Sequence, residues 1–565
     1  MSSTSAPKTP SKEDLAYAKR PVFAAKLDES SFYHEKKTCF VIKQQKYTVP
    51  LKHDPAHPDT ITVTARVVLG MKGERADNWK EMDVTLEPLD DNSFEMVPDK
   101  PIAVYLVGGP GSDNPFTANP EVTDHYLNLG FQVLFMDYRG TGSSTLQRAD
   151  QLDTNAFPNN AMAYPEGVVP SLQGLTAEKQ AETLTWYRQD NIVRDLEAIR
   201  KHLVSAGIKA ANKWTLVGQS YGGWVSFTYL SFYPEALNMV IVTGGIPPVG
   251  QEADDVYRNT YKTVITACDK FYQEYPHHVD NVKRIVKHIQ NHPTPIGMPG
   301  GGKLTPERFL CVGRTLGTTN GDMKVDSAIM ACIRDLGEDE TQPDRELTRD
   351  TLIKIESWLR FEERPLYAIL QEPIYTEHPL RASDWSAEKI GNDYDQYWWL
   401  KDGALKRAFS PKNKADEDFA SENLNGKQIY LSAEHVYHFH YDQFQALQPL
   451  KKAAEILAKK DNWPPLFDVK QLKNNKVPTS SLSYERDMFI DANMSRETLT
   501  KMGENSNIIA EFRGDLMHTA LKDKSDIVLP LLWENLCKLA DVSAADVKSM
   551  TAKPLIKALE AKAQK

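Results

Sequence analysis

Several patterns are scarce or missing in this 565-residue chain, and each absence excludes a class of protein. The five cysteines are scattered without C-x-x-C spacing, which favours reduced thiols in the cytosol over a zinc site or a catalytic cysteine. No run approaches the roughly 18 apolar residues of a membrane helix, and the polar N-terminus has no secretory signal. Lys and Arg total 67 against 77 Asp and Glu, so no basic surface for nucleic acid is expected. No G-x-G-x-x-G fingerprint for a dinucleotide is present.

What the sequence does contain is a series of short apolar runs that end in glycine. They are "PIAVYLVGGPG", "GFQVLFMDYRGTGSS", "KWTLVGQSYGG" and "LNMVIVTGGIPP". Runs without alternation are typical of parallel strands buried on both faces, and helical patterns such as "TLTWYRQDNIVRDLEAIRKHLVSAG" lie between them. The alternation predicts an α/β fold with a doubly wound, mostly parallel sheet.

The same patterns predict the domain organisation. Strand-like sequence patterns return at "VPTSSLSYERDMFI" and "SNIIAEF", after a long charged and amphipathic segment. We expect a flexible tail (1–35), a first core part (36–250), a large helical cap (251–477), a second core part (478–540) and a helical extension (541–565).

One motif carries chemistry. Gly218 to Gly222 reads Gly-Gln-Ser-Tyr-Gly and matches the nucleophile elbow G-x-S-x-G, with a strand before it and a helical pattern after it. The serine of such a turn needs glycine neighbours, because a Cβ there would clash. The sequence therefore predicts Ser220 as a nucleophile, against the alternative of a tight turn with an incidental serine.

A serine nucleophile needs a base and an acid, which follow it along the chain in α/β-hydrolases. His518 is the one histidine beyond residue 440 and follows a predicted strand. The acid should follow the preceding strand, where Glu485, Asp487 and Asp491 are candidates, and Asp487 best fits the end of the segment.

The glycine-rich "VGGPG" segment, 107–111, follows the first buried strand. Backbone N–H groups near Gly109, together with that of Tyr221, would form an oxyanion hole. The alternative is a simple Gly-Pro turn.

Together these motifs resemble the prolyl aminopeptidases (proline iminopeptidases), α/β-hydrolases with a helical cap. The resemblance rests on "GGPG" (108–111), "DYRGTGSS" (137–144) and "GQSYGG" (218–223), in that order. It spans roughly residues 40 to 540 and assigns the catalytic acid to Asp487. The chain departs from the family's pattern at Val107, where His is usual, and in the His-rich segment 431–440. Asp137 and Arg139 are expected to fix the loop near the site.

The resemblance also implies cap glutamates that bind the substrate's N-terminal ammonium. "PLYAILQEPIY" and "LSAEHVYHFH" look like the family's motifs and give Glu372 and Glu434. Read from composition alone, both would be ordinary surface glutamates. The second motif also holds His435, His438 and His440, whose spacing does not fit a usual zinc site.

The sequence thus predicts a cytoplasmic serine aminopeptidase that releases N-terminal proline through an acyl-enzyme. Ser220, Asp487 and His518 form the triad, and no cofactor or metal is implied. Peptides with a free N-terminus are the expected partners, nucleic acid and membranes are not, and a homo-oligomer stays open. An esterase or amidase of other acyl specificity is the alternative, and a non-catalytic binding protein of the same fold is a third reading.

Overall fold

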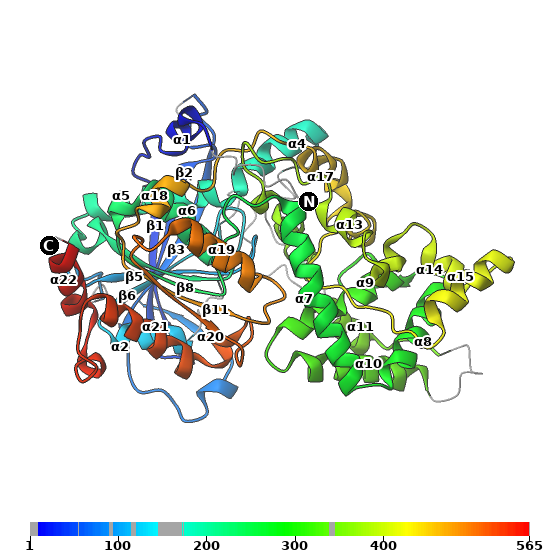
Figure 1. The fold of residues 1–565 in the computed structure, drawn as a ribbon. Coiled ribbons are helices and arrows are strands. Elements are labelled where there is room, and N and C mark those ends of the chain that lie inside the picture. Colours follow the sequence, from blue (N-terminus) through cyan, green and yellow to red (C-terminus); the bar gives the residue numbers. More distant parts are fainter. Residues whose placement is uncertain are drawn as a thin grey trace.

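The computed structural model describes residues 10–54, 56–89, 94–114, 120–144, 172, 174–337 and 345–563, and every structural statement below concerns these residues. Figure 1 shows two lobes, one built on a sheet with helices on both faces and one made mainly of helices. The doubly wound sheet and the large helical insertion that the sequence predicts are confirmed.

The sheet has ten strands in the order β12-β11-β8-β7-β5-β6-β3-β2-β1-β4. Their bounds are β1 Lys26–Glu35, β2 Phe40–Pro50, β3 Thr60–Met71, β4 Leu86–Pro88, β5 Ile102–Leu106, β6 Gln132–Met136, β7 Trp214–Gln219, β8 Leu237–Thr243, β11 Thr479–Tyr484 and β12 Ile508–Arg513. Neighbours from β12 to β6 are parallel, whereas β3 joins β6 antiparallel and begins an antiparallel edge. The carboxyl ends of the parallel strands therefore meet at one edge, where sites of such sheets form.

Each central strand has no exposed face, which explains its unbroken apolar sequence. In β5 all five residues are buried. Val104 and Leu106 belong to the core on one side of the sheet, and Ala103 and Tyr105 to the core on the other. Side chains alternate across a strand, so a strand covered on both faces must be apolar throughout.

Helices from distant parts of the chain cover the two faces (Figure 1). One face carries α5 (Gln189–Ser205), α6 (Tyr221–Phe232) and α18 (Val469–Lys473). The opposite face carries α2, α20, α21 and α22, which are Pro120–Asn128, Ala520–Asp523, Ser525–Leu539 and Ala552–Ala563. Two further helices are α4 (Ala177–Leu184) and α19 (Ala492–Met502).

Between β8 and β11 the chain leaves the sheet and forms the second lobe, called the cap below. Its helices are α7 Ala253–Glu274, α8 His278–Asn291, α9 Pro306–Leu310, α10 Gly321–Leu336, α11 Arg349–Glu356, α12 Pro365–Leu370, α13 Ser386–Gly391, α14 Ala404–Phe409, α15 Lys414–Leu424, α16 His440–Gln443 and α17 Lys451–Ala458. A two-stranded hairpin, β9 (Ile296–Gly297) with β10 (Lys303–Leu304), interrupts them. Across the described ranges, no helix has both the length and the apolar character needed to span a membrane.

The prediction of a flexible tail over 1–35 is wrong for its described part. Helix α1 (Lys12–Ala18) begins with a capping box between Ser11 and Asp14, and β1 pairs along its length with β2. The burial of β1 is low and irregular, so its order comes from backbone pairing rather than an apolar pattern. Residues 1–9 of the predicted tail lie outside the described residues.

Candidate active site

The turn from β7 into α6 holds Ser220 in a backbone conformation that few residues adopt. Its φ of 55° and ψ of −122° are unusual for a residue with a side chain. A Cβ on Gly218 would come within 2.4 Å of the Gly222 carbonyl oxygen, and one on Gly222 within 1.9 Å of the Leu106 carbonyl oxygen. The two glycines are therefore a packing requirement of the turn that presents Ser220.

The structure brings the three predicted triad residues together. His518 Nε2 lies 2.9 Å from Ser220 Oγ, and His518 Nδ1 lies 2.7 Å from Asp487 Oδ2. An ionised carboxylate only accepts hydrogen bonds, so the ring proton belongs on Nδ1 and the lone pair on Nε2 faces the serine hydroxyl. This tautomer is the one in which His518 can accept the Ser220 proton.

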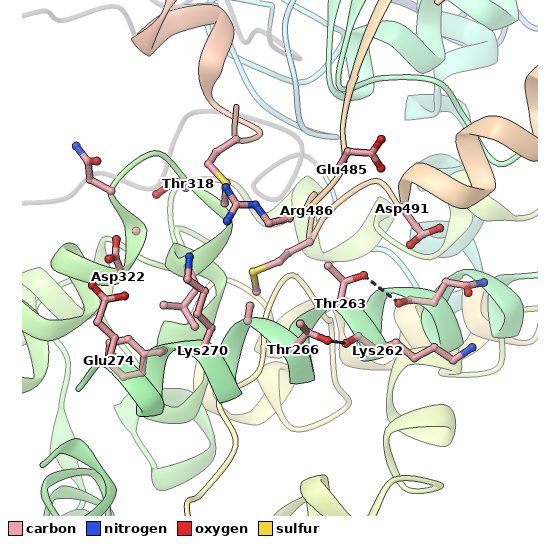
Figure 2. Close-up of a pocket in the computed structure, with 18 of the residues that line it drawn as sticks. Lys262, Thr263, Thr266, Lys270, Glu274, Thr318, Asp322, Glu485, Arg486 and Asp491 are labelled. Carbon is pink, nitrogen blue, oxygen red and sulfur yellow. Dashed lines mark hydrogen bonds between the residues drawn. The ribbon is translucent and has the colours of Figure 1, made fainter. Parts of the chain in front are cut away.

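Of the three acid candidates, Asp487 is the one that contacts His518. Its Oδ1 accepts the N–H groups of Phe489 and Ile490 at 2.8 and 3.1 Å, which fixes the carboxylate in place. Asp491 instead caps α19, and Glu485 pairs with Arg496. Asp491 and Glu485 both line a second cavity of about 460 Å³ between α7 and this loop, and Figure 2 shows both side chains there.

The pKa of His518 is raised above its ordinary value. Burial alone would lower it, but the nearby charge and hydrogen bond of Asp487 outweigh burial, and Glu434 adds to their effect. Negative neighbours favour the imidazolium that forms when the serine proton is taken up.

The glycine-rich loop after β5 lies against the elbow. A Cβ on Gly108 would meet Ser220 Cβ at 3.2 Å, and one on Gly111 would meet the Tyr367 nitrogen of α12 at 2.7 Å. Gly109 lines the same cavity as Ser220. Tyr221 is the first residue of α6, so its N–H has no acceptor within the helix. Both predicted oxyanion donors thus flank the serine.

A cavity of about 360 Å³ opens above Ser220. Its lining includes Gly109, Asp113, Arg314, Arg364, Tyr367, Glu434, His518 and Lys522. Glu434 accepts from Arg314 Nη2 at 3.0 Å and from the Tyr367 hydroxyl. Burial raises the pKa of Glu434, and the charges of Arg314 and His518 oppose that rise.

The second predicted glutamate has different surroundings. Glu372 is buried, and its carboxylate accepts the Ala387 N–H of α13 at 3.0 Å. Burial raises the pKa of Glu372 to about 7 despite that hydrogen bond. Glu372 is not among the described residues that line the Ser220 cavity. The structure therefore places Glu434 beside the serine but supports no substrate contact for Glu372.

The histidines of the 431–440 segment pack inside the cap. His435 contacts Thr260, Ser432 and Tyr437, and His440 accepts the Tyr437 N–H at 3.1 Å. His438 is half-buried and pairs with Glu455 at 3.4 Å. These contacts account for the three side chains by packing and hydrogen bonding with protein groups.

Asp137 and Arg139 hold loops rather than face the cavity. Asp137 pairs with Arg66 at 2.6 Å and accepts the Ser143 N–H at 3.0 Å. Arg139 makes two 2.7 Å contacts to Asp195 of α5. Both side chains are buried, and they tie the loop after β6 to its neighbours.

Sequence reasoning missed two side chains that surround Glu434. Arg314 comes from the short helix η5 (Cys311–Gly317) and Tyr367 from α12. Neither Arg314 nor Tyr367 belongs to a motif that indicates this role, because only the folding of the cap brings their segments close to Glu434. Tyr367 does lie inside the quoted "PLYAILQEPIY" stretch, which is the one available signal.

The chain is similar to several known proteins. Residues 103–282 match the family described as alpha/beta hydrolase fold. The chain is 31% identical over 490 residues to the proline iminopeptidase of Aeromonas sobria, covering 86% of this chain and 94% of that protein. It is 28% identical over 488 residues to the proline iminopeptidase aneH of Aspergillus aculeatus, covering 86% and 92%. Among solved structures, esterase E22 gives a TM-score of 0.34 at 11% identity, covering 92% of this chain and 100% of that one.

The fold and the family match define an α/β hydrolase. The identity to the Aeromonas protein extends over nearly its whole length. The chain therefore belongs to the proline iminopeptidase family.

Proposed function

We propose that this protein is a serine aminopeptidase that releases an N-terminal residue, preferentially proline, from peptides. The observation that carries the proposal is a carboxylate, Glu434, whose side chain is only 13% exposed and which shares a cavity with Ser220. That serine is hydrogen-bonded to His518, and His518 is hydrogen-bonded in turn to Asp487. A nucleophile and an ammonium receptor in one cavity are the two parts that such a reaction needs.

In the proposed reaction Ser220 Oγ attacks the carbonyl carbon of the first residue while His518 Nε2 takes the hydroxyl proton. The N–H groups of Gly109 and Tyr221 stabilise the oxyanion. The C–N bond then breaks, and His518 returns the proton to the leaving nitrogen. Water, activated by the same histidine, releases the acyl group from Ser220. Asp487 holds the ring and stabilises its charged form throughout.

Glu434 is proposed to bind the protonated N-terminus. Its partners Arg314 and Tyr367 orient the carboxylate, and burial strengthens its attraction for a cation. A blocked N-terminus would lose this contact and leave the carboxylate without its ligand. This carboxylate distinguishes an aminopeptidase from a general esterase, because an esterase needs no group that binds an ammonium.

The proposal is tested with proline arylamide, its N-acetyl form and a simple acetate ester. Glu434→Gln should lower kcat/KM for the free-amine arylamide by about 30-fold to several-thousand-fold, the cost of removing one partner of a buried charged hydrogen bond. Ester hydrolysis should change little, because the ester never used the contact. Equal losses on both substrates would mean that Glu434 supports structure only. Faster turnover of the acetylated arylamide by the native protein would favour the esterase or amidase reading.

The proposed cellular location is the cytoplasm, and the cysteines support it. All five are buried and unpaired. An extracellular compartment favours disulfides. Thiol titration of the denatured protein, purified without reductant, should find all five thiols free, and any lower value would argue against this location.

A further inference from the structure

The Ser220 cavity carries more positive charge than the proposed catalytic step uses. Its cations are Arg314, Arg364, Lys522 and, when protonated, His518. Arg314 pairs with Glu434 at 3.0 Å, and Arg364 pairs with Asp113 at 3.0 Å. Lys522 has neither an ion pair nor a side-chain hydrogen bond with any residue in the described ranges.

The neighbouring acid does not neutralise Lys522. Asp523 accepts from the Thr519 hydroxyl at 2.5 Å and forms no ion pair with Lys522. The amine of Lys522 therefore stays available at the edge of the cavity, where the residue is exposed. An amine in this position is open to an anion that enters the cavity.

Lys522 lies four residues after His518 and lines the same cavity, which relates it to the leaving group. His518 must return its proton to the leaving nitrogen, so that nitrogen lies close to His518 Nε2. Helix α20 begins at Ala520, directly after the His518 loop, and presents Lys522 and Leu521 to the same cavity. In the proposed function the acyl residue carries the ammonium that Glu434 binds, which assigns the acyl side of the substrate to Glu434.

We propose that Lys522 binds the C-terminal carboxylate of the leaving peptide, so that short peptides with a free carboxylate are the preferred substrates. This inference rests on the proposed function. The two ends of a short zwitterionic peptide then meet opposite charges in one cavity, the ammonium at Glu434 and the carboxylate at Lys522. A cavity of about 360 Å³ falls in the size range of sites that enclose small ligands.

The experiment compares kcat/KM for Pro-Gly-Gly and its C-terminal amide, and uses the ratio of the two values as the readout. The native protein should prefer the free acid by about two- to fivefold, the range of a solvent-accessible ion pair. Lys522→Ala should bring the ratio close to one, and Lys522→Arg should keep it above one. The change should appear mainly in KM, and 1 M salt should weaken the native preference.

A matched control separates the carboxylate contact from a general change of charge. Lys524→Ala removes a lysine two residues away that is not among the described residues lining the cavity, and it should keep the native ratio. An arm with Pro-Gly-Asp-amide supplies a side-chain carboxylate in place of the terminal one. If that amide matches Pro-Gly-Gly, the assignment to the chain terminus is overturned.

Two outcomes distinguish failure of this inference from failure of the proposed function. Cleavage of both peptides with equal kcat/KM, or a preference that survives in Lys522→Ala, overturns the role of Lys522 alone. Cleavage of neither peptide, in a protein that folds normally, overturns the aminopeptidase proposal and this inference with it.

Discussion

At the scale of single residues, three buried histidines show how neighbouring groups determine the pKa of an imidazole. Burial lowers the pKa of His435 to about 3, and burial with the charge of Arg308 does the same for His440. His518 is buried as well, yet Asp487 turns the direction of its pKa shift upward. The first two therefore stay neutral in the cap, whereas His518 can take up a proton when Ser220 loses one.

The acid assignment gives a prediction with an internal control. Asp487→Asn should lower kcat by about 10⁴, because an amide in place of the carboxylate favours the wrong tautomer of the ring. Asp491→Asn should leave kcat nearly unchanged, because Asn caps a helix as well as Asp. Steady-state kinetics on proline arylamide decides between them. A larger loss in Asp491→Asn would mean that the acid has been misassigned.

The raised pKa of His518 predicts the acid side of the pH profile. His518 must be neutral to act as a base, so kcat/KM falls as pH falls through its pKa. Because that pKa is raised from 6.5, the fall should begin above pH 6.5. Glu434→Gln removes a negative charge that raises the pKa, so the acid limb of its profile should move to lower pH. An unmoved limb, measured on the ester substrate, would show that the two groups are not coupled.

At the scale of elements, the β7–α6 turn depends on close backbone approach. Gly222→Ala should destabilise the fold by about 1–3 kcal/mol or more, because its Cβ would meet the carbonyl oxygen of Leu106 in the central strand β5. Gly297→Ala is the control, since a Cβ there has nothing within 4 Å and should change stability by less than about 0.5 kcal/mol. Urea unfolding measures both. Similar stabilities for the two variants would contradict the packing account.

The elements that sequence patterns predicted well are those buried on both faces. β5, β6 and β7 read as apolar runs because neither side meets water, and the glycine motifs mark where they end. By contrast, the sequence did not predict β1, because most of its side chains are exposed and show no apolar pattern. It did not predict α1 either, because a helix of seven residues is too short to show a helical repeat of apolar residues.

The site was predictable to the extent that it follows from local motifs. The G-x-S-x-G motif predicted Ser220, and the position of His518 in the chain predicted that residue as the base. The surroundings of Glu434 were not, because Arg314 and Tyr367 reach it only through tertiary packing. Glu372 was assigned by motif alone, and its burial against Ala387 could not be read from sequence.

At the scale of the whole molecule, one buried arginine of the core holds the cap. Arg188, at the start of α5, donates to the carbonyl oxygens of Thr376 at 2.5 Å and Pro464 at 2.6 Å. Its guanidinium also lies over the Trp463 ring at 4.6 Å. Two cap segments, one just before α13 and one just after α17, are thereby tied to the sheet lobe.

Arg188→Ala should destabilise the protein by about 3–5 kcal/mol, because it leaves the buried carbonyl groups of Thr376 and Pro464 without their donor and removes one of the two arginines paired with Asp190. Arg258→Ala, which removes an exposed ion pair with Asp255, should cost less than about 1 kcal/mol. Thermal unfolding of both variants checks the difference. Equal stability would mean that the cap is held by its apolar contacts alone.

The central claim is that Ser220 attacks a substrate selected by its free N-terminal amine. The most direct measurement uses a phosphonate ester that carries a proline ring, with its amine either free or acetylated, followed by peptide mass spectrometry. The account predicts that the free-amine reagent labels Ser220 and no other residue, and that acetylation slows labelling strongly. A label on another residue, or equal rates for the two reagents, would contradict it.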